Sequence, residues 1–280
     1  RTYSCEAMMQ DNKALQAGTS HDLGQNFAKA FDLTFQSESG SIEHAWNTSW
    51  GVSTRMIGGL VMTHGDDTGI RVPPLLAPIE VVVVPIYRKD DERDRVLEAA
   101  NALVARLRDW ERREPGRLRV HLDAREGIKP GAKYYHWEMR GIPLRLELGP
   151  KDIENNQCVL VRRDTREKRP VSLDTVGEDV ADLLSAMQQD MLIAARERMD
   201  RNTIRGGIDY ARFRELMEGE GAFVFAGWCG STDCEQRIKE ETKATIRCLP
   251  DEEFRSAEAP AHCLFCGKAA TEEALWARAY

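Results

Sequence analysis

The chain has 280 residues, enough for two or three domains of ordinary size. Apolar residues make up 42% and charged residues 30%, a balance typical of soluble globular proteins that excludes an intrinsically disordered chain. The formal net charge of −7 gives no overall field that would attract nucleic acid. No apolar run approaches the ~20 residues that a membrane span needs.

The first informative stretch covers residues 14–27. Its pattern predicts a strand at 14–16 and then a helix that begins at Thr19 or Ser20, because either hydroxyl can cap a first helical turn. Four apolar residues recur at helical spacing and are expected to face a core: Leu23, Phe27, Ala30 and Phe31. Gln16, Thr19 and His21 would then gather where strand meets helix, a corner that suits a small polar or anionic ligand. The alternative is a capped helix with a surface histidine.

A polar turn with one arginine, Arg55, precedes an apolar helix that ends before Gly65. That helix is expected to carry Met56, Ile57, Leu60, Val61 and His64. The prolines at 73, 74 and 78 restrict their neighbours to extended conformations and mark a domain boundary. Residues 1–78 are therefore predicted to form an antiparallel sheet backed by helices.

From residue 79 strands alternate with helices. Strands are predicted at 79–86, 118–122, 143–148 and 159–162 and around Val171, with helices between them, which indicates an α/β domain with a mixed five-stranded sheet. A long amphipathic helix follows. Two segments of this domain are locally basic and could contact nucleic acid or simply be solvated: Arg106, Arg108, Arg112, Arg113, Arg117 and Arg119 outnumber Asp109, Glu111 and Glu114, and Arg162, Arg163, Arg166, Lys168 and Arg169 outnumber Asp164 and Glu167.

The last module begins near residue 206 and contains two cysteine pairs, Cys229 with Cys234 and Cys263 with Cys266. Two pairs at short spacing can supply four thiolates to one tetrahedral Zn²⁺, and a site with four protein ligands is structural. The alternative is four cysteines packed as small hydrophobic residues. Cys5, Cys158 and Cys248 lie outside this spacing and are expected to be core thiols. Free cysteines indicate a reducing, cytoplasmic environment.

Three sequence words extend these observations: Gln-Ala-Gly-Thr-Ser-His-x-Leu-Gly at 16–24, Thr-Ser-Trp-Gly-x-Ser-x-Arg-x-Ile-Gly at 48–58, and His-Gly-Asp-Asp-x-Gly-x-x-x-Pro-Pro at 64–74. With them, essentially the whole chain resembles the class II prolyl-tRNA synthetases of the archaeal and eukaryotic-like type, which some bacteria also carry. The resemblance implies an α+β and α/β multidomain fold. Residues 1–78 would be the C-terminal part of an antiparallel catalytic domain with motif 3, 79–180 the anticodon-binding domain, 181–205 a connecting helix, and 206–280 a small zinc-binding α+β domain.

The implied activity is ATP-dependent activation of L-proline to prolyl-adenylate and transfer to tRNA(Pro), with Mg²⁺ expected beside ATP. By resemblance, Arg55 is the motif 3 arginine that contacts the triphosphate, and Ser53 is a neighbouring ATP contact. Gln16 and Thr19 match positions that hold the nucleotide, and His21 matches a contact of the proline pocket. Arg55 and His21 are the candidate catalytic residues. Trp50 is expected to wall the proline pocket, although tryptophan at such a position is as often a core residue.

In the second domain the words at 131–138 and 141–151 match the family. Arg145, Glu147 and Lys151 fall at near-alternating positions at a strand end and are expected to project together. Splayed bases are recognised by such hydrogen-bonding groups. Glu138, Arg145 and Lys151 are therefore predicted to read the anticodon, with an ordinary ion cluster as the alternative.

The resemblance also implies what residues 1–280 lack. Motif 1, the motif 2 arginine and the upstream proline-site residues would precede Arg1, so we expect a fragment that is inactive alone and lacks the interface of the homodimer. Tyr280 is expected to reach toward the catalytic domain. Alternatives are a non-catalytic RNA-binding protein built from an anticodon-binding-like domain and a zinc ribbon, a threonine or glycine synthetase, or an enzyme acting on free proline.

Overall fold

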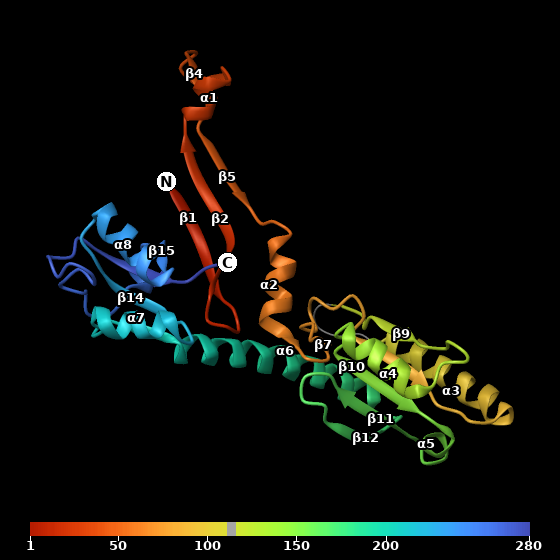
Figure 1. Cartoon of the computed structure of the whole chain (residues 1–280). Coiled ribbons are helices and arrows are strands. Elements are labelled where there is room, and N and C mark those ends of the chain that lie inside the picture. The colour runs from red at the N-terminus through yellow and green to blue at the C-terminus, as the bar shows by residue number, and fades with distance from the viewer. Residues whose placement is uncertain (111–115) are drawn as a thin grey trace. The chain divides into compact units, whose positions relative to one another are not determined.

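The computed structural model describes residues 1–110 and 116–280 (Figure 1). The chain divides into two compact units, one formed by Arg1–Thr63 with Glu197–Tyr280 and the other by His64–Arg196. In the part of the chain described, no helix is both long enough and apolar enough to cross a membrane.

The first unit begins with an antiparallel sheet of three strands in the order β1-β2-β5, as predicted. β1 spans Thr2–Met8, β2 Ala14–Gly24 and β5 Asn47–Gly51. Between β2 and β5 the chain forms a short helix and a small hairpin: α1 (Asn26–Ala30), β3 (Thr34–Gln36) and β4 (Ile42–His44). Helix α2 (Arg55–His64) follows β5 at the predicted position (Figure 1).

The predicted helix start at Thr19 or Ser20 is wrong, because β2 continues as a strand to Gly24. β2 is the central strand and forms backbone hydrogen bonds with β1 on one side and β5 on the other. This pairing outweighs the capping preference of the two hydroxyls. Helix α1 is a single turn, which buries only Ala28.

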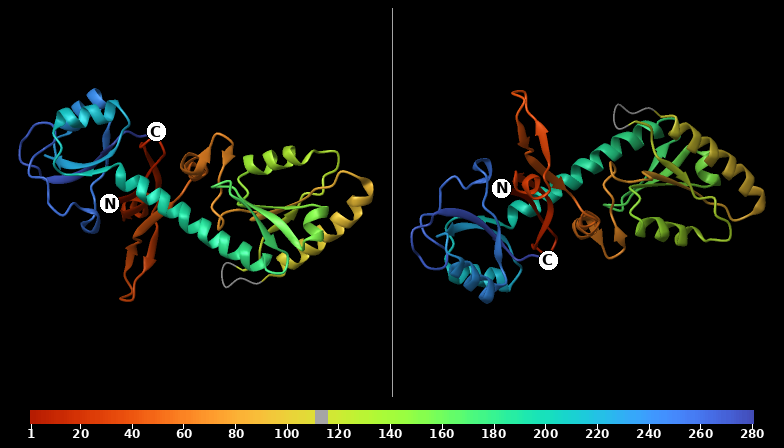
Figure 2. Two further views of the ribbon diagram at one scale, coloured as in Figure 1. Left: turned by 90° about the horizontal axis from the view of Figure 1, so that it is seen from below. Right: turned by 90° about the horizontal axis from the view of Figure 1, so that it is seen from above.

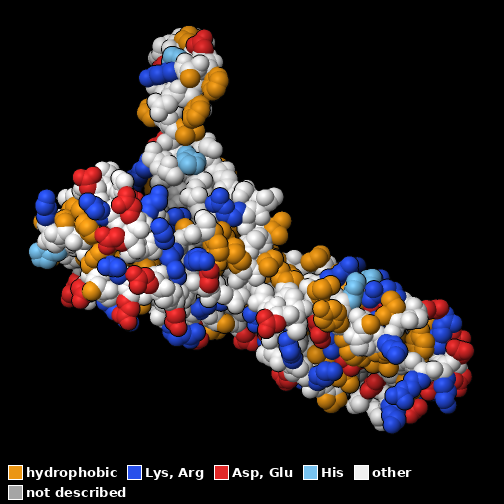
Figure 3. Space-filling view, in the orientation of Figure 1, with side chains coloured by type: hydrophobic (Ala, Val, Ile, Leu, Met, Phe, Trp, Pro, Cys, Tyr) orange, Lys and Arg blue, Asp and Glu red, His pale blue; other side chains and the backbone are white. Residues whose placement is uncertain are grey.

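The expectation that Phe27 and Phe31 face a core is therefore also wrong. Their exposed fractions are 51% and 78%. Figure 3 shows apolar side chains gathered on the lobe that contains α1 and the β3–β4 hairpin; exposed members are Phe27, Phe31, Leu33, Phe35 and Ile42.

The second unit is built on a mixed five-stranded sheet in the order β12-β11-β10-β8-β9, which confirms the predicted sheet. Its strands are β8 (Val81–Pro85), β9 (Val120–Leu122), β10 (Leu144–Leu148), β11 (Gln157–Arg162) and β12 (Lys168–Ser172). β8 runs parallel to β9 and β10, whereas β11 is antiparallel to β10 and β12.

Helices cover both faces of this sheet (Figure 2). α3 (Asp90–Arg108) and the first half of α6 (Val176–Arg201) pack on one face, and α4 (Pro130–Met139) packs on the other. A short helix, α5 (Pro150–Glu154), follows β10. Side chains of β8 alternate between the two layers: Val81 and Val83 join the core under α3, and Val82 and Val84 join the core under α4.

A buried ion cluster holds α4 to the edge of the sheet. Asp123, just after β9, accepts hydrogen bonds from Trp137 Nε1 at 2.7 Å and from Arg125 at 2.8 and 2.7 Å. Lys133 Nζ donates to the backbone oxygen of Asp123 at 2.9 Å. Burial acts to raise the pKa of the Asp123 carboxyl, but hydrogen bonds from Arg125 and Trp137 outweigh it and hold the pKa well below its usual range. Burial lowers the pKa of Lys133.

A hairpin of two short strands, β6 (Gly65–Asp66) and β7 (Gly69–Ile70), lies against the end of α4. Gly69 has φ +135°, and a Cβ there would lie 2.5 Å from Met139 Cα. Gly141 has φ +72°, and a Cβ there would lie 2.6 Å from the Ile70 carbonyl oxygen. Both contacts are with backbone, so only glycine fits at these two positions.

The C-terminal part of the first unit contains a four-stranded sheet in the order β13-β14-β16-β15. The strands are β13 (Thr203–Arg205), β14 (Phe223–Trp228), β15 (Thr245–Cys248) and β16 (Glu272–Ala277), and the helices are α7 (Tyr210–Glu218), α8 (Thr232–Thr242) and the short 3₁₀ helix η1 (Glu252–Phe254). Phe213 and Trp276 are fully buried in its core.

This sheet packs on β1 and β2. Met8 and Ala14 share a core with Phe223 and other apolar residues of β14 and β16. Arg247 donates two hydrogen bonds, of 3.1 and 3.0 Å, to one carboxylate oxygen of Glu6. The amide of Tyr280 donates to the Ala14 carbonyl oxygen at 3.4 Å, beside the β1–β2 turn.

Of the three cysteines expected in cores, Cys158 on β11 is fully buried and Cys248 on β15 is half-buried, but Cys5 on β1 is exposed, so that expectation is wrong for Cys5. β1 lies at the edge of its sheet. Burial raises the pKa of the Cys158 thiol to about 12.

The two basic segments largely bind the protein itself. Arg108 donates to the Val120 carbonyl oxygen at 3.0 Å and Arg119 to the Ala77 carbonyl oxygen at 2.8 Å. Arg162 pairs with Asp164 at 2.7 Å and with Asp190 at 3.0 Å. Four other charges named for the first segment, Glu111, Arg112, Arg113 and Glu114, lie outside the described residues.

Candidate functional site

Polar side chains line one face of β2. Thr19 pairs with Ser4 and His21 with Thr2, so Thr19 and His21 share a face. Gln16 would fall on the other face by simple alternation. A β-bulge at Ala17 corrects this, because Cys5 pairs with Gly18 whereas Glu6 pairs with Gln16.

The structure therefore brings Gln16, Thr19 and His21 together on one face, although along a strand and not at the strand-to-helix corner that was expected. His21 Nε2 lies 3.1 Å from Thr19 Oγ1, and its Nδ1 lies 2.9 Å from Thr2 Oγ1. Both ring nitrogens are thus engaged by hydroxyls, which fixes the orientation of the imidazole. All three predicted residues are partly exposed and open to a ligand.

Arg55 joins this group from the start of α2. Its Nη1 donates to the carbonyl oxygen of Gln16 at 3.3 Å and to Gln16 Oε1 at 3.4 Å. Ser53 Oγ accepts from the Arg55 amide at 3.3 Å, so Ser53 lies at the beginning of the helix. A guanidinium, an amide, a hydroxyl and an imidazole on one partly exposed face of β2 suit an anionic, hydrogen-bonding ligand.

Trp50 lies apart from Thr19 and His21. It pairs with Ser20, whose side chain alternates to the opposite face of β2. The exposed fraction of Trp50 is 78%.

A second candidate site is a pocket of about 420 Å³ in the unit formed by His64–Arg196. Arg145, from β10, is central to it and only 6% exposed. Its guanidinium donates to Glu138 Oε1 at 2.8 Å and to Glu147 Oε1 at 3.0 Å, and it lies 4.0 Å from the centroid of the Tyr134 ring. The pocket is lined by α4 and the β11–β12 hairpin: Gly131, Tyr134, Tyr135, Trp137, Glu138, Val161, Arg162, Arg163, Arg166 and Lys168, with Val82, Ile142 and Arg145.

The pocket combines a cation, an anion and aromatic rings. Lys168 Nζ lies 3.5 Å from Glu147 Oε1 and 5.7 Å from the Tyr134 centroid. Burial and the neighbouring Glu147 carboxylate raise the pKa of Tyr134, so its phenol stays protonated. Stacking surfaces with hydrogen-bonding groups beside them are how proteins hold unstacked bases.

Arg145 and Glu147 thus lie together as predicted and Glu138 contacts Arg145, but Lys151 does not join them. Lys151 is exposed on α5, because the chain turns into that helix directly after β10, and the expectation that Arg145, Glu147 and Lys151 project together is wrong for Lys151. Sequence reasoning missed Tyr134 as a pocket residue, although it lies within the sequence word that contains Glu138.

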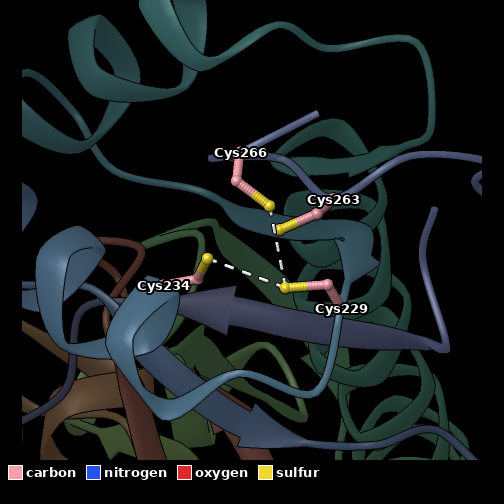
Figure 4. A group of neighbouring side chains, drawn as sticks. All are labelled: Cys229, Cys234, Cys263 and Cys266. Carbon is pink, nitrogen blue, oxygen red and sulfur yellow. Dashed lines mark hydrogen bonds between the residues drawn. The ribbon is translucent and has the colours of Figure 1, made fainter. Parts of the chain in front are cut away.

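The third candidate site is a cluster of four thiols (Figure 4). Cys229 follows β14, Cys234 lies in the first turn of α8, and Cys263 and Cys266 come from the loop before β16. All four sulfur atoms lie within 4.8 Å of one another; Cys229 Sγ is 3.6 Å from Cys234 Sγ and 3.7 Å from Cys266 Sγ. Four thiolates at Zn–S distances of about 2.3 Å have sulfur atoms about 3.8 Å apart, so the cluster fits a tetrahedral ion.

The local backbone favours thiolate at one of these positions. Burial acts to raise the pKa of Cys263, but backbone amides of Cys266, Phe265 and Cys229 donate to its sulfur and lower the pKa to about 7. Gly267, at φ +68°, turns the chain, and its amide bonds the Cys263 carbonyl oxygen at 3.0 Å. Burial raises the pKa of Cys234 to about 12.

Comparison with known proteins gives first the class of protein. The family described as "Anticodon binding domain" matches residues 80–183, the part of the chain that forms the five-stranded sheet and its helices. The family described as "Prolyl-tRNA synthetase, C-terminal" matches residues 210–280, which contain the four cysteines. The chain therefore combines domains of the aminoacyl-tRNA synthetases.

Individual relatives are proline–tRNA ligases. The chain is 45% identical over 280 residues to the proline–tRNA ligase of Flavobacterium johnsoniae, and the match covers 100% of this chain and 55% of that protein. It is 46% identical to those of Roseiflexus sp. strain RS-1 and Alkaliphilus oremlandii, again over 100% of this chain and 56% and 55% of theirs. The chain is thus homologous along its whole length to the prolyl-tRNA synthetases, and it spans about half the length of these curated relatives.

Proposed function

We propose that the chain is part of a prolyl-tRNA synthetase, an aminoacyl-tRNA ligase that activates L-proline with ATP and transfers it to tRNA(Pro). The observation that carries the proposal is the clustering of Gln16, Thr19, His21 and Arg55 on one face of an antiparallel sheet. A non-catalytic RNA-binding protein has no need of these ligand-facing groups, and nothing in the chain favours that alternative.

Activation of a carboxylic acid by ATP requires no covalent protein nucleophile. The carboxylate of proline attacks the α-phosphate in line, so the protein acts by orienting the reactants and neutralising phosphate charge. We assign the charge neutralisation to Arg55, whose guanidinium stays protonated and presents a planar set of donors to the triphosphate. Gln16, which accepts a hydrogen bond from Arg55, also fixes the direction of that side chain.

Thr19 and Ser53 are proposed as further ATP contacts. Thr19 shares a face of β2 with Gln16, and Ser53 Oγ accepts a hydrogen bond from the Arg55 amide. His21 is proposed to contact proline. Trp50 is proposed to contact proline around the edge of β5, which is an edge strand of the sheet. Mg²⁺ is expected to accompany the phosphates of ATP, and no residue of this chain is assigned to it.

The pocket around Arg145 is proposed to bind anticodon bases. Glu138 and Arg145 supply an acceptor and a donor fork for base edges, and Tyr134 supplies a ring. Lys151, exposed on the next helix, is proposed to contact the backbone of the anticodon loop, where charge suffices.

The four-thiol cluster is proposed to bind one structural Zn²⁺. Thiolates of Cys229, Cys234, Cys263 and Cys266 would hold it, leaving no open position for chemistry. A bound ion would tie the end of β14, the start of α8 and the loop before β16 together.

Further properties follow from the same proposal. We assign domain limits of 1–78, 79–180, 181–205 and 206–280, the archaeal and eukaryotic-like type, a homodimeric whole protein, and a cytoplasmic location. The free cysteines support a reducing compartment.

The test is proline-dependent ATP–pyrophosphate exchange on the full-length parent protein and its Arg55→Ala variant. We expect exchange with proline and not with threonine or glycine, and a loss of at least about a hundredfold in the variant. Arg201→Ala removes an exposed arginine of α6 and serves as the control. Absence of exchange with intact tRNA binding would instead support the non-catalytic RNA-binding protein.

A further inference from the structure

The sequence word at 64–74 has no part in the functions proposed so far. It forms the β6–β7 hairpin, and its first aspartate, Asp66, makes a bidentate ion pair with Arg163. Nη1 and Nη2 of Arg163 each donate to one oxygen of the Asp66 carboxylate, both at 2.8 Å. The side chain of Arg163 is 3% exposed, so few other partners are accessible to it.

Arg163 has a third contact, which points to the pocket. Its Nε donates to the backbone carbonyl oxygen of Glu138 at 2.9 Å. Glu138 in turn accepts from Arg145 Nη1 at 2.8 Å. One guanidinium therefore fixes the backbone of the residue whose side chain orients Arg145.

The rest of the hairpin supports the same end of α4. Gly69 packs against the backbone of Met139, and Gly141 packs against the backbone of Ile70, both closer than any Cβ allows. The amide of Val72 also donates to the Gly141 carbonyl oxygen at 3.2 Å. The last turn of α4 is thus held by Arg163 on one side and by glycine contacts on the other.

We infer that Arg163 is a positioning residue of the anticodon pocket and that Asp66 clamps it in place. This inference rests on the proposed anticodon-binding function. Asp66 lies two residues after the end of α2, which begins at Arg55, so the clamp also ties the pocket to the chain that leaves the proposed ATP-binding helix. The fork geometry matters here, because only a planar guanidinium can satisfy two carboxylate oxygens and a carbonyl at once.

The test uses the full-length parent protein with Asp66→Asn and, as a milder change, Arg163→Lys. For both variants we expect kcat/KM for tRNA(Pro) to fall at least about tenfold, mainly through KM, and discrimination against anticodon-altered tRNA to shrink by a similar factor. Proline-dependent pyrophosphate exchange, measured without tRNA, is expected to stay within about twofold of the parent for Asp66→Asn.

Asp179→Asn is the matched control, since Asp179 pairs with Arg169 of the same β11–β12 hairpin at 3.3 Å and lies outside the pocket lining. It is expected to leave tRNA discrimination unchanged. Equal losses of exchange and charging in Asp66→Asn, or full discrimination in both variants, would overturn the inference. Failure of the unmodified parent to charge tRNA(Pro) would instead remove the proposed function itself.

Discussion

Asp123 offers a sharp test of the electrostatics in the second unit. In Asp123→Asn the side chain keeps an acceptor for Trp137 Nε1 but loses its charge. Removing one partner of a buried ion pair costs about 3–5 kcal/mol. The Arg125 side chain is 40% exposed and regains water when its partner is lost, so we expect loss of the Arg125–Asp123 pair to cost only the ~0–1 kcal/mol of a surface ion pair. The Lys133 side chain is only 4% exposed, so its ammonium group cannot be rehydrated in this way. We therefore expect Asp123→Asn to lower the local stability by about 3 kcal/mol.

Amide hydrogen exchange followed by mass spectrometry measures this loss in the unit concerned. Peptides covering β8 and β10 are expected to exchange on the order of a hundredfold faster in Asp123→Asn. Adding Lys133→Met removes the uncompensated ammonium and should recover most of the protection. Asp94→Asn, at a side chain that is 90% exposed, is the control. Unchanged exchange in Asp123→Asn, or a Lys133→Met effect that adds to the damage, would refute the reasoning.

Three other predictions concern the zinc cluster, the hairpin and pH. Cys266→Ser should lower bound zinc from about one ion per chain to nearly none by elemental analysis, whereas Cys248→Ser should not. Gly69→Ala should cost at least about 2 kcal/mol by exchange of α4 amides, because its Cβ would lie 2.5 Å from Met139 Cα. The Arg163 guanidinium lowers the pKa of Asp66, so this pair stabilises the fold above the unfolded pKa of about 4 and its contribution is lost as pH falls below it. Asp66→Asn should therefore flatten the acid side of the stability profile, measured by exchange.

Each of these has an outcome that contradicts it. Retention of zinc by Cys266→Ser would mean that the ion has other ligands. Normal protection in Gly69→Ala would show that the hairpin can move away from α4. An acid transition with the same slope in Asp66→Asn and the unmodified chain would remove Asp66 from the groups that govern it.

Regular elements of the second unit could be predicted from sequence because local patterns and tertiary packing agree. Val81 to Val84 read as a strand buried on both faces, and that is how they pack. The four cysteines were also predictable, since the spacing within each pair reflects local turns around a shared centre.

Other features depend on partners distant in sequence. Thr19 and Ser20 have the chemistry of helix caps, and only their pairing with β1 and β5 makes them strand residues. By its sequence spacing Lys151 would point to the same side of β10 as Arg145, but the chain turns into α5 before it reaches Lys151. Arg163 appeared in the sequence as one charge of a basic segment, and its pairing with Asp66, 97 positions away, has no local signal.

Because of the bulge at Ala17, the face of β2 on which Gln16 lies depends on the number of residues between Gln16 and Thr19. Three positions separate Gln16 from Thr19, an odd number, which an unbroken strand would translate into opposite faces. Many substitutions at position 17 preserve the count, whereas loss of a single residue there changes it. Deletion of Ala17 would remove the extra residue and leave Gln16 two positions before Thr19, so the two side chains would still share a face of β2 and Arg55 would keep its Gln16 side-chain partner. The shared face of Gln16 and Thr19 should therefore survive both replacement and loss of Ala17.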